Sequence, residues 1–193
     1  MLGAAEKNAA LLAMADRLVA DADAILAANA LDVEAAEGSI SEVMIDRLRL
    51  DKKRIEGMSD GIRQVAALPD PVGRELDKVI RPSGIVVTKL SVPLGVVAII
   101  YESRPNVTSD AAALCIKSGN VCVLRIGKEA YRSARAIVEA MRAGLACVGL
   151  DRDLINLVED TSRQSASDIM TATGLVDLLI PRGGKGLIDA CVQ

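Results

Sequence analysis

Apolar residues in the first part of the chain recur with the period of an α-helix. Over residues 4–28 they stand three, four and seven positions apart, which places them on one face of a helix. This face comprises Leu11, Met14, Leu18 and Ile25. The pattern predicts a long helix whose apolar stripe packs against the rest of the protein.

A second helix is predicted to begin after Asp51, whose side chain suits an N-cap position. The sequence LPDPVG closes this helix, because proline and glycine interrupt helical backbone. Its apolar face comprises Ile55, Met58, Ile62 and Val65. We interpret residues 1–73 as a helical lead-in to the domain that follows.

Residues 74–94 are strand-like on both sides of the sequence RPSG. Pro82 and Gly84 in this sequence supply the turn that joins two strands. The segment predicts a β-ribbon outside the main sheet, and such a ribbon is a possible oligomerisation element.

From Gly95 onward, short apolar runs alternate with helical stretches. The runs GVVAIIY, NVCVLRI, DLINLVE and VDLLIPR are continuous in their apolar character, as in strands that are buried on both faces. Helical patterns at residues 109–117, 131–147 and 162–171 lie between them. Residues 95–193 therefore predict an α/β fold, a Rossmann-like parallel sheet with helices on both faces.

The composition narrows the classes of partner. Only Tyr101 and Tyr131 are aromatic among 193 residues, so stacking platforms for single-stranded nucleic acid are nearly excluded. The net charge is −3 and no long run of Lys or Arg occurs, which argues against nucleic-acid and membrane partners. The apolar runs fall short of the roughly 20 residues that span a bilayer. We expect a soluble, cytoplasmic protein.

The four cysteines give no sign of metal binding or nucleophilic catalysis. They lack CxxC spacing, they stand in apolar surroundings, and the chain has no His. These residues are Cys115, Cys122, Cys147 and Cys191. We predict small buried thiols and no metal site.

Polar or glycine-rich sequence follows each predicted strand of the parallel sheet. These sequences are YESRPN, RIGKE, EDTSRQ and PRGGKG. In open parallel sheets, ligands bind at the carboxyl ends of the strands, where the strand order reverses. The clustering of polar residues at the strand ends is therefore the first indication of function.

Each of these sequences also has a purely structural interpretation. Asn106 and Thr108 precede a helix, so they are candidates for oxyanion or anion binding, but helix capping is the simpler interpretation on pattern alone. Arg125 and Lys128 flank Gly127 and suit a phosphate or ribose, or else a solvated loop. PRGGKGL matches neither GxGxxG nor GxxxxGK[ST], and a tight strand-to-helix turn explains it equally well.

Taken together, VPLGVVAIIYESRPNVTSDAAALCIKSGNVCVLRIGKEA and DLLIPRGGKGL resemble the γ-glutamyl phosphate reductase (glutamate-5-semialdehyde dehydrogenase) branch of the aldehyde dehydrogenase superfamily. The most specific parts are YESRPNVT and IPRGGKGL. The resemblance extends over nearly the whole chain, including the lead-in. It implies NADPH-dependent reduction of L-glutamyl 5-phosphate to L-glutamate 5-semialdehyde, with release of phosphate, in proline biosynthesis.

The resemblance also implies roles for individual residues. Asn106 corresponds to an asparagine that donates to the substrate carbonyl oxygen, although the loop length around it differs from that of ordinary aldehyde dehydrogenases. Glu102 and Arg104 lie where they could meet the charged substrate. The cofactor NADP(H) would be bound by Arg125, Gly127, Lys128, Gly183 and Gly184, and the cation at Lys128 agrees with a 2′-phosphate.

None of the four cysteines has the surroundings of the family's catalytic cysteine, which is expected beyond Gln193 in a second domain. The resemblance thus implies that the chain is the N-terminal, cofactor-binding half, which alone is inactive and exposes apolar surface. The full-length protein is expected to be a homo-oligomer.

Two alternatives remain open at this point. The chain could be a non-catalytic nucleotide-binding or scaffold protein derived from an aldehyde dehydrogenase. It could also come from a bifunctional protein that carries the kinase, although Met1 leads directly into the first helix.

Overall fold

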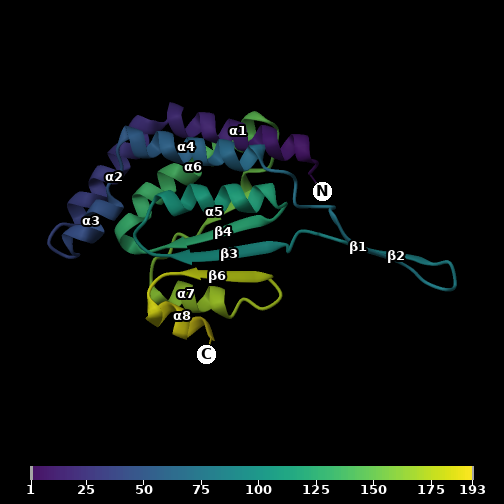
Figure 1. The fold of residues 1–193 in the computed structure, drawn as a ribbon. Coiled ribbons are helices and arrows are strands. Elements are labelled where there is room, and N and C mark those ends of the chain that lie inside the picture. The colour runs from purple at the N-terminus through teal and green to yellow at the C-terminus, as the bar shows by residue number, and fades with distance from the viewer. Residues whose placement is uncertain (1, 193) are drawn as a thin grey trace.

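A four-stranded parallel sheet with helices on both faces forms the body of the molecule (Figure 1). The structure is a computed structural model and describes residues 2–192. The helices are α1 (Ala4–Ala20), α2 (Ala22–Ala36), α3 (Glu42–Leu48), α4 (Lys52–Ala67), α5 (Asn106–Lys117), α6 (Tyr131–Cys147), α7 (Arg163–Met170) and α8 (Lys185–Val192). The strands are β1 (Glu75–Ile80), β2 (Val86–Leu90), β3 (Val96–Tyr101), β4 (Val121–Ile126), β5 (Ile155–Leu157) and β6 (Leu178–Arg182). The predicted α/β fold is confirmed.

The strand order β5-β4-β3-β6 places a reversal beside the central strand β3. The chain runs outward from β3 to β4 and β5, then returns to place β6 on the other side of β3. Tyr101, the last residue of β3, is level with Ile126 of β4 and with Arg182 of β6. The carboxyl ends of three strands therefore meet at the point where the strand order reverses.

The apolar face predicted over residues 4–28 is buried, but the predicted single helix is wrong. Helix α1 ends at Ala20 and α2 begins at Ala22. Between them, the backbone N–H of Asp21 donates to the carbonyl oxygens of Arg17 and Val19, and its carboxylate accepts two hydrogen bonds from Arg17. The backbone bond to Arg17 is an ordinary helical bond and the Arg17–Asp21 pair has the spacing of helical neighbours, so the break is local. No glycine or proline marks it in the sequence.

Two layers of helices cover one face of the sheet. Helices α5 and α6 lie on the strands, and α1 and α4 pack on these helices (Figure 1). Gly144 allows α6 to approach α1 closely, because a Cβ atom at this position would lie 2.7 Å from Cα of Met14. The second predicted helix matches α4, in which Asp51 accepts a hydrogen bond from the backbone N–H of Arg54.

Buried polar side chains tie the lead-in to the sheet domain. The Lys117 ammonium on α5 donates to Asn8 of α1 at 2.7 Å and to the carbonyl oxygen of Ala66 at 2.8 Å. Asp32 of α2 accepts hydrogen bonds from the backbone N–H and the hydroxyl of Ser133 near the start of α6. These bonds join the lead-in to the helices that cover the sheet.

The ribbon of β1 and β2 is antiparallel and projects from the end of the sheet opposite to the carboxyl ends of the strands (Figure 1). Every residue of both strands is exposed. The prediction of a ribbon outside the main sheet is confirmed. Among the residues that the structure describes, no helix is long and apolar enough to cross a membrane.

Candidate functional site

A buried hydrogen bond fixes the start of the loop that follows β3. The hydroxyl of Tyr101 lies 2.7 Å from the hydroxyl of Thr108, and both side chains are almost completely buried. Burial raises the pKa of Tyr101, so its hydroxyl stays protonated and neutral. This bond joins the end of β3 to the first turn of α5, and it holds the loop 102–105 at the edge of the sheet.

The alternative interpretation of Asn106 and Thr108 as helix caps is wrong. Helix α5 begins at Asn106 itself, its N-cap position is Pro105, and no side chain donates or accepts a cap hydrogen bond there. Thr108 binds Tyr101 instead, and the side chain of Asn106 is exposed at the wall of a cleft. Asn106 is therefore accessible to a ligand in this cleft.

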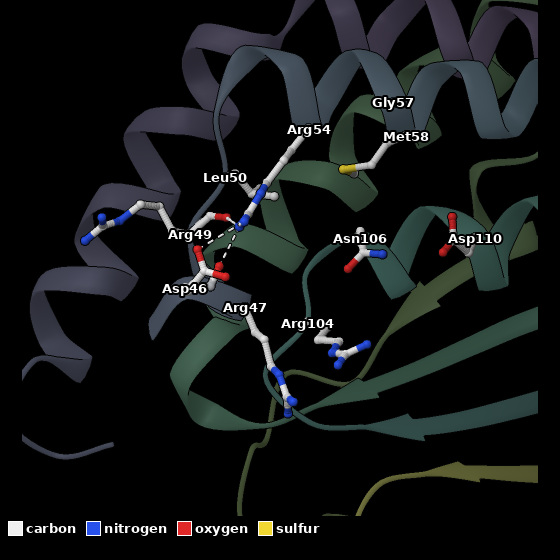
Figure 2. Close-up of a pocket in the computed structure, with 10 residues that line it drawn as sticks. All are labelled: Asp46, Arg47, Arg49, Leu50, Arg54, Gly57, Met58, Arg104, Asn106 and Asp110. Atoms are coloured by element: carbon white, nitrogen blue, oxygen red, sulfur yellow. Dashed lines mark hydrogen bonds and ion pairs between the residues drawn. The ribbon is translucent and has the colours of Figure 1, made fainter. Parts of the chain in front are cut away.

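The cleft beside Asn106 has a volume of about 480 Å³ and lies between α3, α4 and the start of α5 (Figure 2). Arg54 is held on its wall by the Asp46 carboxylate at 3.2 Å and by the carbonyl oxygens of Asp46 and Arg49. In Figure 2, Arg49 points away from Asn106, whereas Arg47 extends towards the strand ends near Arg104. The lining residues are Asp46, Arg47, Arg49, Leu50, Arg54, Gly57, Met58, Arg104, Asn106 and Asp110.

A second cleft of about 520 Å³ adjoins the first, since Arg47 and Arg104 line both. It opens over the ends of β3 and β6. Its lining residues are Met44, Arg47, Tyr101, Glu102, Ser103, Arg104, Val107, Arg182, Gly183 and Gly184. The second cleft thus brings the loop after β3 and the glycine-rich turn after β6 to one place, as the sequence analysis expected for strand ends.

The carboxylate of Glu102 contacts the glycine-rich turn. One of its oxygens accepts a hydrogen bond of 3.0 Å from the backbone N–H of Gly184. A Cβ atom at position 183 would lie 2.8 Å from the same oxygen, so Gly183 is needed for this close approach. Glu102 therefore connects the two loops, which sequence reasoning alone did not indicate.

Arg125 points to the loop after β5. Its guanidinium donates to the carbonyl oxygens of Thr161 and Ser162, at 2.8 and 2.7 Å, and lies 3.4 Å from the hydroxyl of Ser165. These bonds hold the segment that leads into α7. The side chain of Arg125 is thus occupied within the protein.

Lys128 is exposed in a short 3-10 helix before α6. It lines a separate hollow with Asp32 and Arg132, between α2 and the start of α6. Gly127 stays at the strand ends, where its N–H donates to the carbonyl oxygen of Tyr101 at 3.1 Å. The structure brings Glu102, Arg104, Asn106, Gly183 and Gly184 together at the two clefts and places Lys128 apart from them.

Charged residues of the clefts that were not singled out from the sequence include Arg47, Arg182 and Asp110. Arg47 comes from the lead-in, where nothing in the helical pattern distinguishes it from a solvated arginine. Arg182 stands inside the motif PRGGKG, so the motif could have indicated it. Burial raises the pKa of Asp110, and the nearby Arg182 opposes this rise.

The prediction of buried thiols is right for two cysteines and wrong for Cys147, which is exposed, and Cys191, which is partly exposed. Cys115 and Cys122 are buried between α5 and β4. A hydrogen bond with the Cys115 thiol, together with burial, raises the pKa of Cys122, so this thiol stays protonated. In residues 2–192 the structure contains no group of three or more side chains that could hold a metal ion.

Comparison with known proteins identifies close relatives. The chain is 59% identical over 188 residues to a γ-glutamyl phosphate reductase of Streptococcus suis, a match that covers 97% of this chain and 46% of that protein. The crystal structure of γ-glutamyl phosphate reductase from Thermotoga maritima superposes with a TM-score of 0.96 at 38% identity, over 99% of this chain and 46% of the other. The resemblance seen in the sequence motifs is confirmed, and the chain spans about half the length of the curated relatives it matches.

A more distant structure extends the likeness in fold. An NAD-dependent aldehyde dehydrogenase from Sinorhizobium meliloti matches with a TM-score of 0.77 at 17% identity, over 99% of this chain and 35% of that one. This likeness shows the fold alone. No family model matches the chain.

Proposed function

We propose that this chain, a homologue of about half of γ-glutamyl phosphate reductase, supplies the nicotinamide-cofactor site and the oxyanion donor of such an enzyme. The reaction is the NADPH-dependent reduction of L-glutamyl 5-phosphate to L-glutamate 5-semialdehyde and phosphate, in the cytoplasm. The observation that carries the proposal is the exposed Asn106 in a cleft that adjoins the turn of Gly183 and Gly184. Hydride transfer to a bound acyl group requires a hydrogen-bond donor to the acyl carbonyl oxygen close to the bound cofactor. Asn106 and the glycine-rich turn, at adjoining clefts, suit these two roles.

The residues around the strand ends fit a nicotinamide cofactor in part. Gly183 and Gly184 form a turn before α8 that a phosphate group can approach closely, and Gly127 stands at the neighbouring strand end. Lys128 is an exposed cation that suits a 2′-phosphate. Arg125, however, is bound to loop carbonyl oxygens, so we assign it the role of ordering the segment before α7.

The cofactor supplies the hydride, and the chain supplies positioning and electrostatic stabilisation. The amide of Asn106 donates to the carbonyl oxygen of the substrate as negative charge develops there. Glu102 holds the glycine-rich turn against the loop after β3. The nucleophilic cysteine comes from the second half of the enzyme, since Cys115 and Cys122 are buried and line neither cleft.

A specific observation favours a second candidate function, that of an assembly element. The ribbon of β1 and β2 exposes large apolar side chains on a segment that stands clear of the body. These side chains are Leu76, Val79, Ile80, Val86, Val87 and Leu90. We propose that the ribbon contributes to a homo-oligomer, whether or not the chain also binds a cofactor.

Isothermal titration calorimetry of the 193-residue chain with NADP⁺ and NAD⁺ tests the cofactor site. We expect NADP⁺ to bind more tightly than NAD⁺. Lys128→Glu should weaken NADP⁺ binding by about tenfold or more and NAD⁺ binding by less. Lys89→Glu on the exposed strand β2 is the matched control. A folded chain that shows no heat with either nucleotide would leave only the assembly function.

The role of Asn106 is tested in an enzyme that joins this chain to the cysteine-bearing half. Asn106→Ala is expected to lower the turnover number by about 10²–10³-fold, the usual loss for one oxyanion donor. Ser118→Ala, at the other end of α5, is a control that should retain turnover. Normal turnover in the Asn106 variant would remove the oxyanion role.

A further inference from the structure

Three arginines converge on the second cleft from three separate elements. Arg47 comes from α3, Arg104 from the loop after β3, and Arg182 from the last position of β6. Within residues 2–192 none of the three lies within ion-pair distance of a carboxylate. By contrast, Arg54 on the wall of the first cleft is paired with Asp46. The second cleft therefore gathers three cations without an ion pair in the described part of the protein, and Arg182 lies near enough to Asp110 to influence the pKa of that carboxyl group.

This concentration of positive charge is notable in a chain whose net charge is −3. Glu102 is the one carboxylate among the lining residues of the second cleft, and its oxygen already accepts the N–H of Gly184. Like charges that face one another across a cleft repel, and a bound anion removes this repulsion. Arginine is suited to such an anion because its planar guanidinium donates two parallel hydrogen bonds to a phosphate or a carboxylate.

The start of α5 adds to the attraction for an anion. This helix has twelve residues, and its amino-terminal end is at the clefts, where Asn106 stands in its first turn. The dipole of a helix start favours negative charge, whereas the N–H groups of Val107 and Thr108 already donate to the carbonyl oxygens of Arg104 and Pro105. The helix end is a supporting feature here, and the three convergent arginines carry the argument.

We infer that Arg47, Arg104 and Arg182 bind the phosphoryl group of the acyl phosphate substrate. The inference rests on the proposed function and deepens it. Arg47 and Arg104 line both clefts, so an anion bound to them lies next to the cleft that contains Asn106. In an acyl phosphate the phosphoryl group is attached to the reacting carboxyl group, whereas the α-carboxylate of a glutamyl group is several bonds away. An anion site beside Asn106, the proposed hydrogen-bond donor to the substrate carbonyl oxygen, therefore fits the phosphoryl group.

Inorganic phosphate is the probe that tests this inference. Phosphate is titrated into the 193-residue chain that is already saturated with NADP⁺, and binding is followed by calorimetry and by the phosphorus NMR signal. We expect saturable binding that weakens by about tenfold or more in each of Arg47→Gln, Arg104→Gln and Arg182→Gln. Arg135→Gln, an exposed arginine of α6 that makes no ion pair in the described residues, is the control and should bind normally.

Other arms of the experiment separate the sources of the anion. In a second titration, phosphate is first bound to the nucleotide-free chain; if NADP⁺ then displaces it competitively, the arginines hold a phosphate of the cofactor and the inference is overturned. If L-glutamate binds with the same arginine dependence while phosphate does not, the site is for the α-carboxylate, which also overturns it. Far-ultraviolet circular dichroism of each variant establishes that it is folded, and Arg47→Lys keeps the charge while it removes the bidentate geometry.

The outcome is independent of the cofactor test. Loss of NADP⁺ affinity in Lys128→Glu with phosphate binding unchanged supports two separate sites. Normal NADP⁺ binding without any arginine-dependent phosphate binding overturns the inference and leaves the proposed function in place. Arginine-dependent phosphate binding in a chain that binds neither nucleotide supports the anion site but contradicts the cofactor assignment.

Discussion

The two faces of the parallel sheet differ sharply in how they are packed. On one face, α5 and α6 lie on the strands and are themselves covered by α1 and α4 (Figure 1). On the other face, α7 has Ser165 as its buried residue, and no residue of Lys185–Cys191 in α8 is buried. Large apolar side chains stay exposed there, among them Leu175, Leu178, Ile180 and Ile188.

The difference shows how the site is built. The two-layered face fixes β3 and α5, and through them the positions of Arg104 and Asn106. The open face carries β6 and α8, so the glycine-rich turn is held to the rest of the site mainly through β3 and Glu102. We propose that the second half of the enzyme packs on this open face, in accord with the chain spanning about half of its curated relatives.

A glycine-to-alanine substitution in one helix on each face tests this comparison with the largest expected effect. Gly144→Ala places a Cβ atom against the backbone of Met14, so it should lower the free energy of unfolding by about 3 kcal/mol or more. Gly186→Ala in α8 meets no atom within 4 Å and should be neutral or stabilising by up to about 1 kcal/mol. Urea denaturation measures both; equal losses would contradict the difference between the faces.

A buried and an exposed ion pair provide the next contrast. Lys7 is almost completely buried and lies 2.6 Å from Asp70, and this hydrogen bond is the main reason that the pKa of Asp70 is lowered. Asp70→Asn should cost about 1–3 kcal/mol of unfolding free energy at neutral pH. Asp16→Asn removes the exposed pair with Arg63 and should change stability by less than about 1 kcal/mol.

The pH dependence of this loss follows from the direction of the pKa shift. Because the pKa of Asp70 is lowered by folding, the pair stabilises the folded state fully above the ordinary aspartate value of 3.8. Its contribution is lost as the pH falls through the lowered value. The difference in stability between the wild type and Asp70→Asn should therefore shrink in strong acid. A difference that grew on acidification would contradict the assignment.

The smallest expected effect concerns Asp110 in the first cleft. Burial raises its pKa, so a charged Asp110 destabilises the folded state at neutral pH. Asp110→Asn should therefore increase the melting temperature slightly at pH 7, and the gain should vanish as the pH falls below 3.8, where Asp110 is protonated in both states. A gain that persisted in acid would indicate a cause other than charge.

The fold could be predicted from the sequence because its signals are local. Continuous apolar strands, helices between them and the RPSG turn each depend on neighbouring residues, and the structure matches them. The break at Asp21 was missed because no glycine or proline marks it, and the Arg17–Asp21 pair has the spacing that a continuous helix also shows.

The candidate site was predicted less completely, because it depends on contacts between distant segments. The strand-end rule brought Glu102, Arg104, Gly183 and Gly184 to one edge, but it could not indicate that Glu102 binds the turn. Arg47 lies more than fifty positions before Arg104 in the sequence, and only packing places it on the same cleft. The hydrogen bonds of Arg125 to the loop before α7 likewise depend on tertiary structure.

Hydrogen–deuterium exchange with and without saturating NADP⁺ tests most directly the central claim, that this chain binds a nicotinamide cofactor at the carboxyl ends of its strands. We expect slower exchange in peptides that cover residues 126–130 and 182–187, and no change in the ribbon of β1 and β2. Absence of protection at both strand ends, or protection confined to other segments, would contradict the account.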